Sequence, residues 1–283
     1  MAKIVVFDSG LGSLSIIQAI QKVIKSHIIY FADQKNFPYG KKSKLELTKI
    51  ITKTVNLLEE KFKPDLIVIG SNTPSLLVEI NKKNIVKVLP PIKKAAKISI
   101  TGNVAILATL AVVRSKKLTE YVRKSRLPKH VKLKRIDATQ LVRLVEDGKF
   151  LDNWKLCEKT VGKVLSEPFS KSNVDVAILS STHLPFLLPI LKKQFPNIIF
   201  VDPAKEIAQK VRKMVAKKPS RTNTIKIFTS SDPKKFQKYL WEIGIKKNVR
   251  SEEHTSELQS QAYLVCRLRL EKKKEKTKTT SST

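Results

Sequence analysis

The sequence predicts an α/β fold of two similar lobes, each with a mostly parallel sheet flanked by helices, around a central cleft. Three observations favour this fold. Short apolar runs alternate with longer amphipathic stretches along most of the 283 residues, as in parallel sheets covered by helices. A hydrophobic content of 41% is enough for a sizeable core. Residues 65–72 and 175–182 both run from Asp through four apolar residues to a loop bearing serine, which suggests two related halves.

The first series of elements ends at Pro90 and Pro91, which break the pattern. Its strands share β-branched and aromatic residues and are expected at 4–7, 27–31, 65–69 and 86–89. Its helices share apolar residues at helical spacing and are expected at 14–24 and 45–61.

The second series starts after Gly102. Its strands are expected at 104–107, 131–133, 175–179 and 198–201, followed by a last strand at 225–228. Its helices are expected at 115–124, 138–147, 187–195, 204–216 and 233–243. Asp202 is the expected N-cap of the helix at 204–216, with Pro203 at the first helical position, since both residue types favour those places.

Nothing in the sequence predicts export or membrane insertion. The chain has no apolar run of about 18 residues, so no transmembrane helix is expected. The first three residues lead straight into an apolar strand, which is too short for a signal peptide. Two cysteines, Cys157 and Cys266, do not make a disulfide framework. We therefore expect a cytoplasmic protein.

The formal net charge of +32 is extreme and raises the question of a polyanionic partner. The basic residues are spread along the whole chain, and no zinc-finger spacing or RNA-binding signature accompanies them. Two interpretations stay open: a generally lysine-rich solvated surface, or a surface that binds a polyanion for function. Either one predicts nonspecific, salt-sensitive binding to nucleic acid.

The C-terminal segment differs from the rest of the chain. Residues 250–274 resemble a translated short-read sequencing adapter, and residues 251–260 back-translate to adapter sequence in a single reading frame. We therefore expect the native sequence to diverge near Val249, Cys266 to lie outside the native protein, and residues 250–283 to be an artefactual or disordered tail. The alternative is an amphipathic helix over 252–270.

Four polar loops follow predicted strands, and ligands of open α/β sheets bind beyond the carboxyl ends of the strands. The loops are 8–12 (Asp-Ser-Gly-Leu-Gly), 37–40 (Phe-Pro-Tyr-Gly), 71–73 (Ser-Asn-Thr) and 181–183 (Ser-Thr-His). Each has a plain structural interpretation when it stands alone: a turn capped by Asp8 or Ser9, an ordinary turn, or a structural His183. The first loop has only two of the three glycines of a dinucleotide fingerprint.

In order and spacing together, these loops resemble the active-site loops of glutamate racemase, in the aspartate/glutamate racemase superfamily. The resemblance runs from Lys3 to about Gly244 and includes further segments at 108–113, 141–146 and 228–233. It implies two lobes around one cleft, with residues 1–97 and about 205–249 in the first lobe and 98–204 in the second. In that family a pair of cysteines faces the substrate's α-carbon, one removing a proton and the other returning one.

The resemblance also implies an activity and its setting. The activity is an isomerase that interconverts L- and D-glutamate with no cofactor, neither pyridoxal phosphate nor a metal. The setting is the cytoplasm, where D-glutamate serves peptidoglycan synthesis and hence cell-wall biogenesis and cell shape. The implied partner is glutamate or a related dicarboxylate, a homodimer stays open, and no membrane partner is expected.

Serine stands at both positions where the family has its catalytic cysteines, namely Ser71 and Ser181. By resemblance, Asp8 tunes the group at position 71, and His183 with Glu146 tunes the group at position 181. The residues that the resemblance assigns to substrate binding are Ser9, Tyr39, Gly40, Asn72, Thr73, Thr109 and Thr182.

The exchange of sulfur for oxygen weakens the expected chemistry. A thiol has a pKa of about 8.5, whereas an aliphatic hydroxyl is several units more basic and stays protonated at pH 7. A gap of four or so pKa units costs on the order of 5 kcal/mol, which is roughly a thousandfold or more in rate. We therefore expect the chain to bind an acidic amino acid and to racemise it slowly or not at all.

Alternative functions follow from the same residues. One is a racemase that works despite its serines, and another is a catalytically silent relative with a regulatory or partner-binding role. A third is a hydrolase in which His183 activates Ser181. The third is disfavoured, because the sequence shows no further residue that would orient His183.

Overall fold

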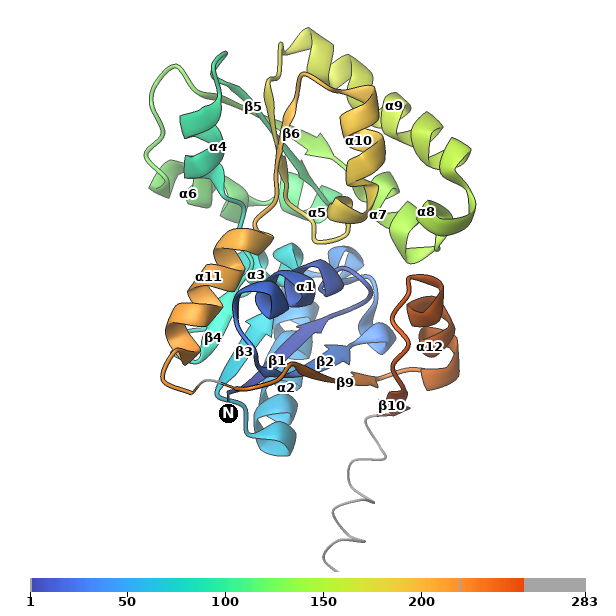
Figure 1. The fold of residues 1–283 in the computed structure, drawn as a ribbon. Coiled ribbons are helices and arrows are strands. Elements are labelled where there is room, and N and C mark those ends of the chain that lie inside the picture. Colours follow the sequence, from blue (N-terminus) through green and yellow to red (C-terminus); the bar gives the residue numbers. More distant parts are fainter. Residues whose placement is uncertain (1, 219, 252–283) are drawn as a thin grey trace, which may run out of the picture.

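The computed structural model of the chain describes residues 2–218 and 220–251, which form two lobes (Figure 1). We define the first lobe by a six-stranded sheet in the order β10-β9-β2-β1-β3-β4, and the second by a four-stranded sheet in the order β6-β5-β7-β8. Each pairing between described strands is parallel. The predicted α/β fold with parallel sheets flanked by helices is confirmed.

The strands are short. Those of the first lobe are β1 (Lys3–Asp8), β2 (His27–Ala32), β3 (Leu66–Ile69), β4 (Ile85–Lys87), β9 (Thr224–Thr229) and β10 (Val249–Ser251). Those of the second lobe are β5 (Asn103–Ala108), β6 (Lys132–Asp137), β7 (Val176–Leu179) and β8 (Ile199–Val201). Every residue of β3 and β7 is buried, as expected for central strands of a parallel sheet covered on both faces.

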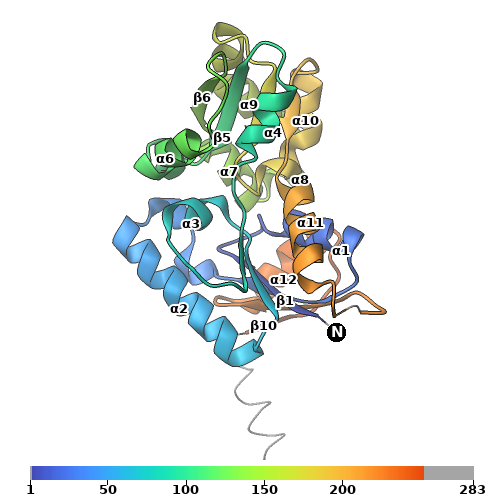
Figure 2. The same ribbon diagram turned by 90° about the vertical axis from the view of Figure 1, so that its left-hand side faces the viewer.

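Helices cover both faces of each sheet (Figure 2). Those packed on the first sheet are α1 (Leu14–Val23), α2 (Lys44–Phe62), α3 (Asn72–Leu77), α11 (Ala204–Val215) and α12 (Pro233–Glu242). Those of the second lobe are α4 (Ile92–Ile98), α5 (Leu110–Val113), α6 (Lys116–Lys124), α7 (Thr139–Glu146), α8 (Lys149–Asp152), α9 (Trp154–Lys171) and α10 (Leu188–Gln194). Three 3₁₀ turns complete the set: η1 (Gln34–Asn36), η2 (Tyr39–Lys41) and η3 (Leu184–Leu187).

Helix α9 is the largest element that the sequence did not predict. It contains Gly162 and Pro168, two residue types that disfavour a helix interior. Its buried residues recur every four positions and pack into the core of the second lobe; they are Cys157, Val161, Leu165 and Phe169. Burial of this apolar stripe therefore outweighs the local propensity.

One further expectation needs correction. Helix α11 has its N-cap at Pro203, not at Asp202, although the Asp202 carboxylate still accepts a hydrogen bond from the Ala204 N–H at 2.8 Å. Arg250, where the predicted tail begins, pairs with Phe228 of β9. Residues 252–283, which include Cys266 and the alternative C-terminal helix, lie outside the described residues. The domain boundaries stay a prediction.

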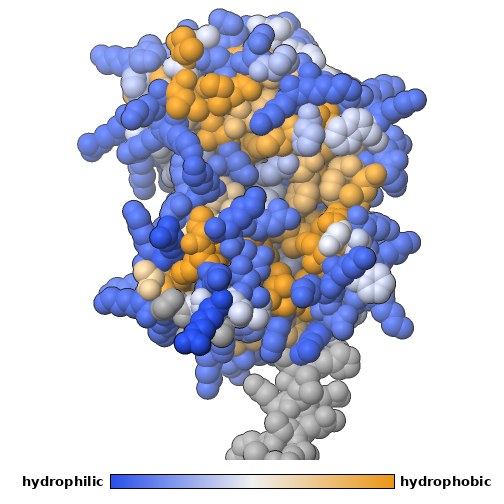
Figure 3. All heavy atoms as spheres, in the orientation of Figure 1, coloured by the Kyte–Doolittle hydropathy of each residue, from blue (hydrophilic) through white to orange (hydrophobic). Residues whose placement is uncertain are grey.

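Hydrophilic side chains project from both lobes over the face shown in Figure 3, with apolar residues between them. Over the described part of the chain, no helix is long and apolar enough to cross a membrane.

Candidate active site

The predicted polar loops meet where the two lobes face each other. Asp8 is the last residue of β1, and Thr109 directly follows β5. Ser71 and Ser181 each lie two residues beyond a buried strand, β3 and β7 respectively. The two serines therefore hold equivalent places in the two lobes, one on each side of the interface.

Asp8 is a fully buried carboxyl beside Ser71. Its Oδ1 accepts a hydrogen bond from the Ser9 backbone N–H at 2.6 Å, and its Oδ2 has no hydrogen-bond partner among the described residues. Burial raises the pKa of Asp8 from 3.8 to about 6, while the positive charge of His183 lowers it and Glu146 raises it. The nearby Ser71 hydroxyl also lowers this pKa.

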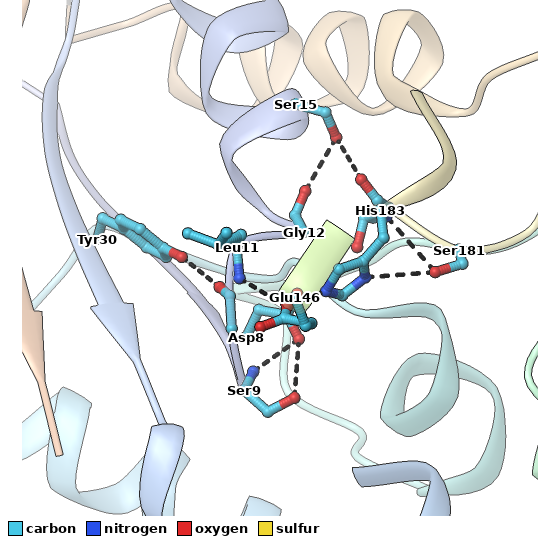
Figure 4. Close-up of polar contacts among 11 residues, drawn as sticks. Asp8, Ser9, Leu11, Gly12, Ser15, Tyr30, Glu146, Ser181 and His183 are labelled. Carbon is cyan, nitrogen blue, oxygen red and sulfur yellow. Dashed lines mark hydrogen bonds and ion pairs between the residues drawn. The ribbon is translucent and has the colours of Figure 1, made fainter. Parts of the chain in front are cut away.

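His183 connects Ser181 with Glu146 (Figure 4). The His183 Nδ1 lies 3.4 Å from the Ser181 Oγ, and its Nε2 forms a short hydrogen bond with Glu146 Oε1. Burial lowers the pKa of His183. The carboxylates of Glu146 and Asp8 raise this pKa by more, so that it lies above its usual value of 6.5. The imidazole therefore keeps its proton, and its ion pair with Glu146, to a higher pH than a free histidine does.

This arrangement corrects one expectation. The sequence showed no residue that would orient His183, yet Glu146 does so from the last turn of α7. The two residues are 37 positions apart, and no local pattern relates them. Only the family resemblance pointed to Glu146, because a lone glutamate at a helix end otherwise looks like any solvated charge.

Hydrogen bonds across the cleft hold the two lobes together. Each joins a group of the first lobe to a group of the second. They are Leu11 N–H to Glu146 Oε1 at 2.9 Å, Ser15 Oγ to the Thr182 carbonyl at 3.1 Å, Asn72 Nδ2 to Ser180 Oγ at 3.0 Å, and Thr73 Oγ1 to Thr109 Oγ1 at 3.2 Å. Several predicted substrate-binding groups are thus paired with one another, and Ser180 is a partner that the sequence analysis did not select.

The loop after β1 needs glycine because the opposite lobe comes so close. A Cβ on Gly10 would lie 2.1 Å from a carboxylate oxygen of Glu146. A Cβ on Gly12 would lie 2.5 Å from Thr182 Oγ1 and 2.6 Å from the imidazole of His183. Both distances are far below van der Waals contact, so the two glycines bring the first lobe into direct contact with the acid/base groups of the second.

Tyr39 is fixed from behind by a buried carboxylate. Its hydroxyl donates to Asp33 Oδ2 at 2.9 Å, and Asp33 Oδ1 accepts from Ser230 Oγ at 3.1 Å. Burial raises the pKa of Tyr39 well above 10, and the negative charge of Asp33 raises it further. The hydroxyl of Tyr39 therefore positions the 37–40 loop in this structure, a role that was not predicted for it.

The cleft encloses a small cavity of about 40 Å³, which we call the inner cavity. Its lining contains most of the predicted site residues: Ser9, Tyr39, Gly40, Ser71, Asn72, Thr73, Thr109, Ser181 and His183. Asp8, Glu146 and Thr182 lie behind this lining rather than in it. Phe37 and Pro38 of the predicted 37–40 loop also line the cavity, together with Val142 and Ser180, which were not predicted as site residues. Typical small-molecule sites measure roughly 300–1,000 Å³, so an amino acid needs the lobes to move apart.

The geometry offers acid/base chemistry. Two hydroxyls face the inner cavity, one backed by Asp8 and the other by the His183–Glu146 pair. Among residues 2–218 and 220–251, no group of three or more His, Cys, Asp or Glu side chains is placed to hold a metal ion.

Solved structures that share this architecture include glutamate racemases. Glutamate racemase isoform RacE1 from Bacillus anthracis matches with a TM-score of 0.76 over 89% of this chain and 96% of that chain, at 22% identity. Escherichia coli glutamate racemase, in complex with L-glutamate and the activator UDP-MurNAc-ala, matches with a TM-score of 0.75 over 88% and 96%, at 23% identity. The fold is therefore that of the two-lobed amino-acid racemases.

Sequence comparison narrows this class. Glutamate racemase of Actinobacillus pleuropneumoniae is 32% identical over 220 residues, which cover 75% of this chain and 82% of that protein. The Bartonella quintana enzyme is 30% identical over 256 residues, covering 84% and 92%. No family model matches the chain. On the similarity to these relatives, the chain belongs to the glutamate racemase family.

Proposed function

We propose that this protein binds glutamate or a related dicarboxylate between Ser71 and Ser181 and racemises it slowly or not at all. One observation supports the proposal: polar groups surround positions 71 and 181, and serine stands where the resemblance implies the two catalytic cysteines. Solved relatives support the ligand class, since the Francisella tularensis enzyme is in complex with D-glutamate and the Escherichia coli enzyme with L-glutamate. The setting we propose is that of the family, D-glutamate supply for the cell wall.

On the side of Ser181, the neighbouring groups favour an acid over a base. The Glu146 carboxylate raises the pKa of His183, so the imidazole holds its second proton to a higher pH than a free histidine and is to that extent less available to accept the Ser181 proton. A protonated imidazole stabilises a thiolate, which forms near neutral pH, but it does not bring a hydroxyl with a far higher pKa to ionise. Ser181 can therefore donate or relay a proton more readily than it can remove one.

On the side of Ser71, the nearest base is Asp8. With a pKa of about 6, this carboxylate is mostly ionised at pH 7, but it is a weak base for removing a proton from carbon. It also lies behind the lining of the inner cavity, so it reaches the substrate only through the Ser71 hydroxyl. The two sides are thus unequal, and racemisation needs both in turn.

The proposal is tested by measuring binding and chemistry on the same preparation. Calorimetric titration with D-glutamate and with L-glutamate reports binding, and proton–deuterium exchange at the α-carbon in D₂O reports chemistry. We expect saturable binding of at least one enantiomer, with exchange roughly a thousandfold or more below that of a relative with both cysteines, assayed in parallel. Exchange at the rate of that relative would overturn the slow-racemase proposal. Absence of binding by both enantiomers would overturn the proposed ligand class.

The second candidate is a silent relative that binds an acidic amino acid for a regulatory or partner-binding role. The closed cleft favours it, because the groups proposed to hold substrate are already paired across the lobes. Binding with no detectable exchange would select this candidate. Hydrolysis is less well supported: Glu146 does complete a Ser–His–Glu chain, but its carboxylate raises the pKa of His183, and a hydrolase needs the neutral imidazole as its base.

A further inference from the structure

A second cavity, of about 460 Å³, opens directly beside the inner cavity, and we call it the outer cavity. The two cavities share five lining residues: Phe37, Pro38, Gly40, Thr109 and Val142. The outer cavity is therefore the continuation of the inner one toward solvent, between η2 of the first lobe and α5 and α7 of the second. Its volume is more than ten times that of the inner cavity and falls within the usual range for a small-molecule site.

The walls of the outer cavity are apolar and its edge is cationic. Phe37 and Leu110 are 37% and 38% exposed and lie together in this lining. Lys41 and Arg143 are exposed residues of the lining, and neither forms an ion pair with a described carboxylate. Asp147 is the single acidic residue of this lining. Such a surface fits a ligand that carries an apolar group with an anion at its far end.

The position of the reacting carbon indicates which part of a ligand can reach this space. The α-carbon has to lie between Ser71 and Ser181 for either hydroxyl to exchange its proton. The α-amino and α-carboxylate groups are charged and need the polar lining of the inner cavity. The side chain is then the substituent that is free to run past Gly40 and Thr109 into the outer cavity.

We propose that the outer cavity is a subsite for a γ-linked extension of glutamate, that is, a γ-glutamyl compound with an apolar group and a terminal carboxylate. The apolar group lies against Phe37 and Leu110, and the terminal carboxylate pairs with Arg143 and Lys41. The proposal rests on the proposed function, because the amino-acid end occupies the inner cavity. It adds to that function a ligand class larger than free glutamate.

The test is calorimetric titration of the full chain with three ligands: glutamate, γ-glutamylphenylalanine, and γ-glutamylphenylalanine amide, which lacks the terminal charge. The protein variants are Arg143→Gln, Lys41→Gln and the double variant. Arg212→Gln is the matched control, because it removes one exposed positive charge on α11, away from both cavities. Circular dichroism verifies that each variant is folded.

We expect γ-glutamylphenylalanine to bind the unmodified chain on the order of tenfold more tightly than glutamate. Removing either cation weakens the binding of this dipeptide by up to about fivefold, which corresponds to the free energy of an exposed ion pair. The amide shows the same loss, whereas glutamate binding stays within about twofold in every variant. Arg212→Gln changes none of the three affinities.

Two results overturn the subsite. One is that the double variant binds glutamate and the dipeptide more weakly by the same factor, which would mean that Lys41 and Arg143 attract anions in general. The other is a dipeptide that fails to bind while glutamate binds. If glutamate does not bind to the unmodified chain, the proposed function is overturned. Dipeptide binding that depends on Arg143 would in that case still support the outer cavity as a binding site. If neither glutamate nor the dipeptide binds, both proposals are overturned.

Discussion

At the two proposed catalytic positions, serine in place of the cysteine that the resemblance implies would change the basicity of the group that faces the inner cavity. Ser181 keeps its contact with His183, and Ser71 keeps Asp8 behind it. These neighbours are suited to a thiolate, because a protonated imidazole and a weak carboxylate base both act on a group that ionises near neutral pH. We therefore propose that the neighbours of the two serines would suit thiols at both positions.

Restoring the thiols is the direct test at this scale. We predict that the double variant Ser71→Cys with Ser181→Cys raises α-proton exchange of glutamate by roughly a thousandfold, because a thiolate is reached at about 5 kcal/mol less than an alkoxide. The measurement is deuterium incorporation by NMR. Each single variant serves as control and should remain well below the double one, since racemisation needs both groups. A double variant no faster than the unmodified chain would mean that the cleft differs in more than sulfur.

The buried charge of Asp8 predicts a pH-dependent cost in stability. Its folded-state pKa of about 6 lies above the ordinary 3.8, so folding favours the protonated form. The stabilisation is fully present below pH 3.8 and is lost as pH rises through 6. Asp8→Asn, a neutral isostere, should therefore raise the free energy of unfolding at pH 7 by up to about 3 kcal/mol, with no gain near pH 3.5. Urea unfolding at both pH values measures this difference.

Asp65 provides the matched control with the opposite sign. Burial raises the pKa of Asp65, but hydrogen bonds from Lys218 and the Lys3 N–H lower it below its ordinary value. Its stabilisation is present above the unfolded pKa and is lost on acidification. Asp65→Asn should thus destabilise the chain at pH 7. If Asp8→Asn were also destabilising at pH 7, the ionised Asp8 carboxylate would be stabilised by its surroundings and not destabilised by its burial.

At the scale of elements, the β1–α1 loop shows what local sequence can and cannot predict. Its glycines and polar residues after a strand predicted a ligand loop, and the structure places that loop at the cleft. The reason for glycine at positions 10 and 12 lies elsewhere, in Glu146, Thr182 and His183 of the other lobe. A contact between segments so far apart in sequence leaves no local pattern, and the same holds for α9, whose helix depends on burial.

Gly12→Ala tests this close approach. Its Cβ would lie 2.5 Å from Thr182 Oγ1 and 2.7 Å from Asp8 Oδ2, so the lobes must separate or the loop must shift. We predict a loss of about 1–3 kcal/mol in the free energy of unfolding, together with weaker glutamate binding. Gly162→Ala in α9 is the control, since its Cβ meets nothing closer than 3.6 Å and should stabilise the helix by about 0.5–1 kcal/mol. Equal stability of Gly12→Ala and the unmodified chain would contradict this account.

At the scale of the whole molecule, alternation of strands and helices was enough to predict an α/β protein, because the pattern is repeated over most of the chain. The closed state of the cleft could not be predicted from the sequence. It depends on side-chain pairs such as Asn72 with Ser180 and Thr73 with Thr109, which join loops from different lobes. The family resemblance supplied the site residues, and the coordinates add which of them face the cavity and which stand behind it.

The charge of the whole molecule leads to a last prediction. Residues 250–283 hold eight basic and five acidic residues, so +29 of the net +32 belongs to residues 1–249. Charge spread over both lobes attracts any polyanion, and each phosphate neutralised releases counterions. We expect fluorescence anisotropy to show equal affinities for two DNA duplexes of unrelated sequence, falling on the order of a thousandfold between 50 and 200 mM salt if about six phosphates are contacted. A marked preference for one duplex that persists at high salt would instead indicate a dedicated nucleic-acid surface, because base recognition depends less on salt than phosphate contacts do.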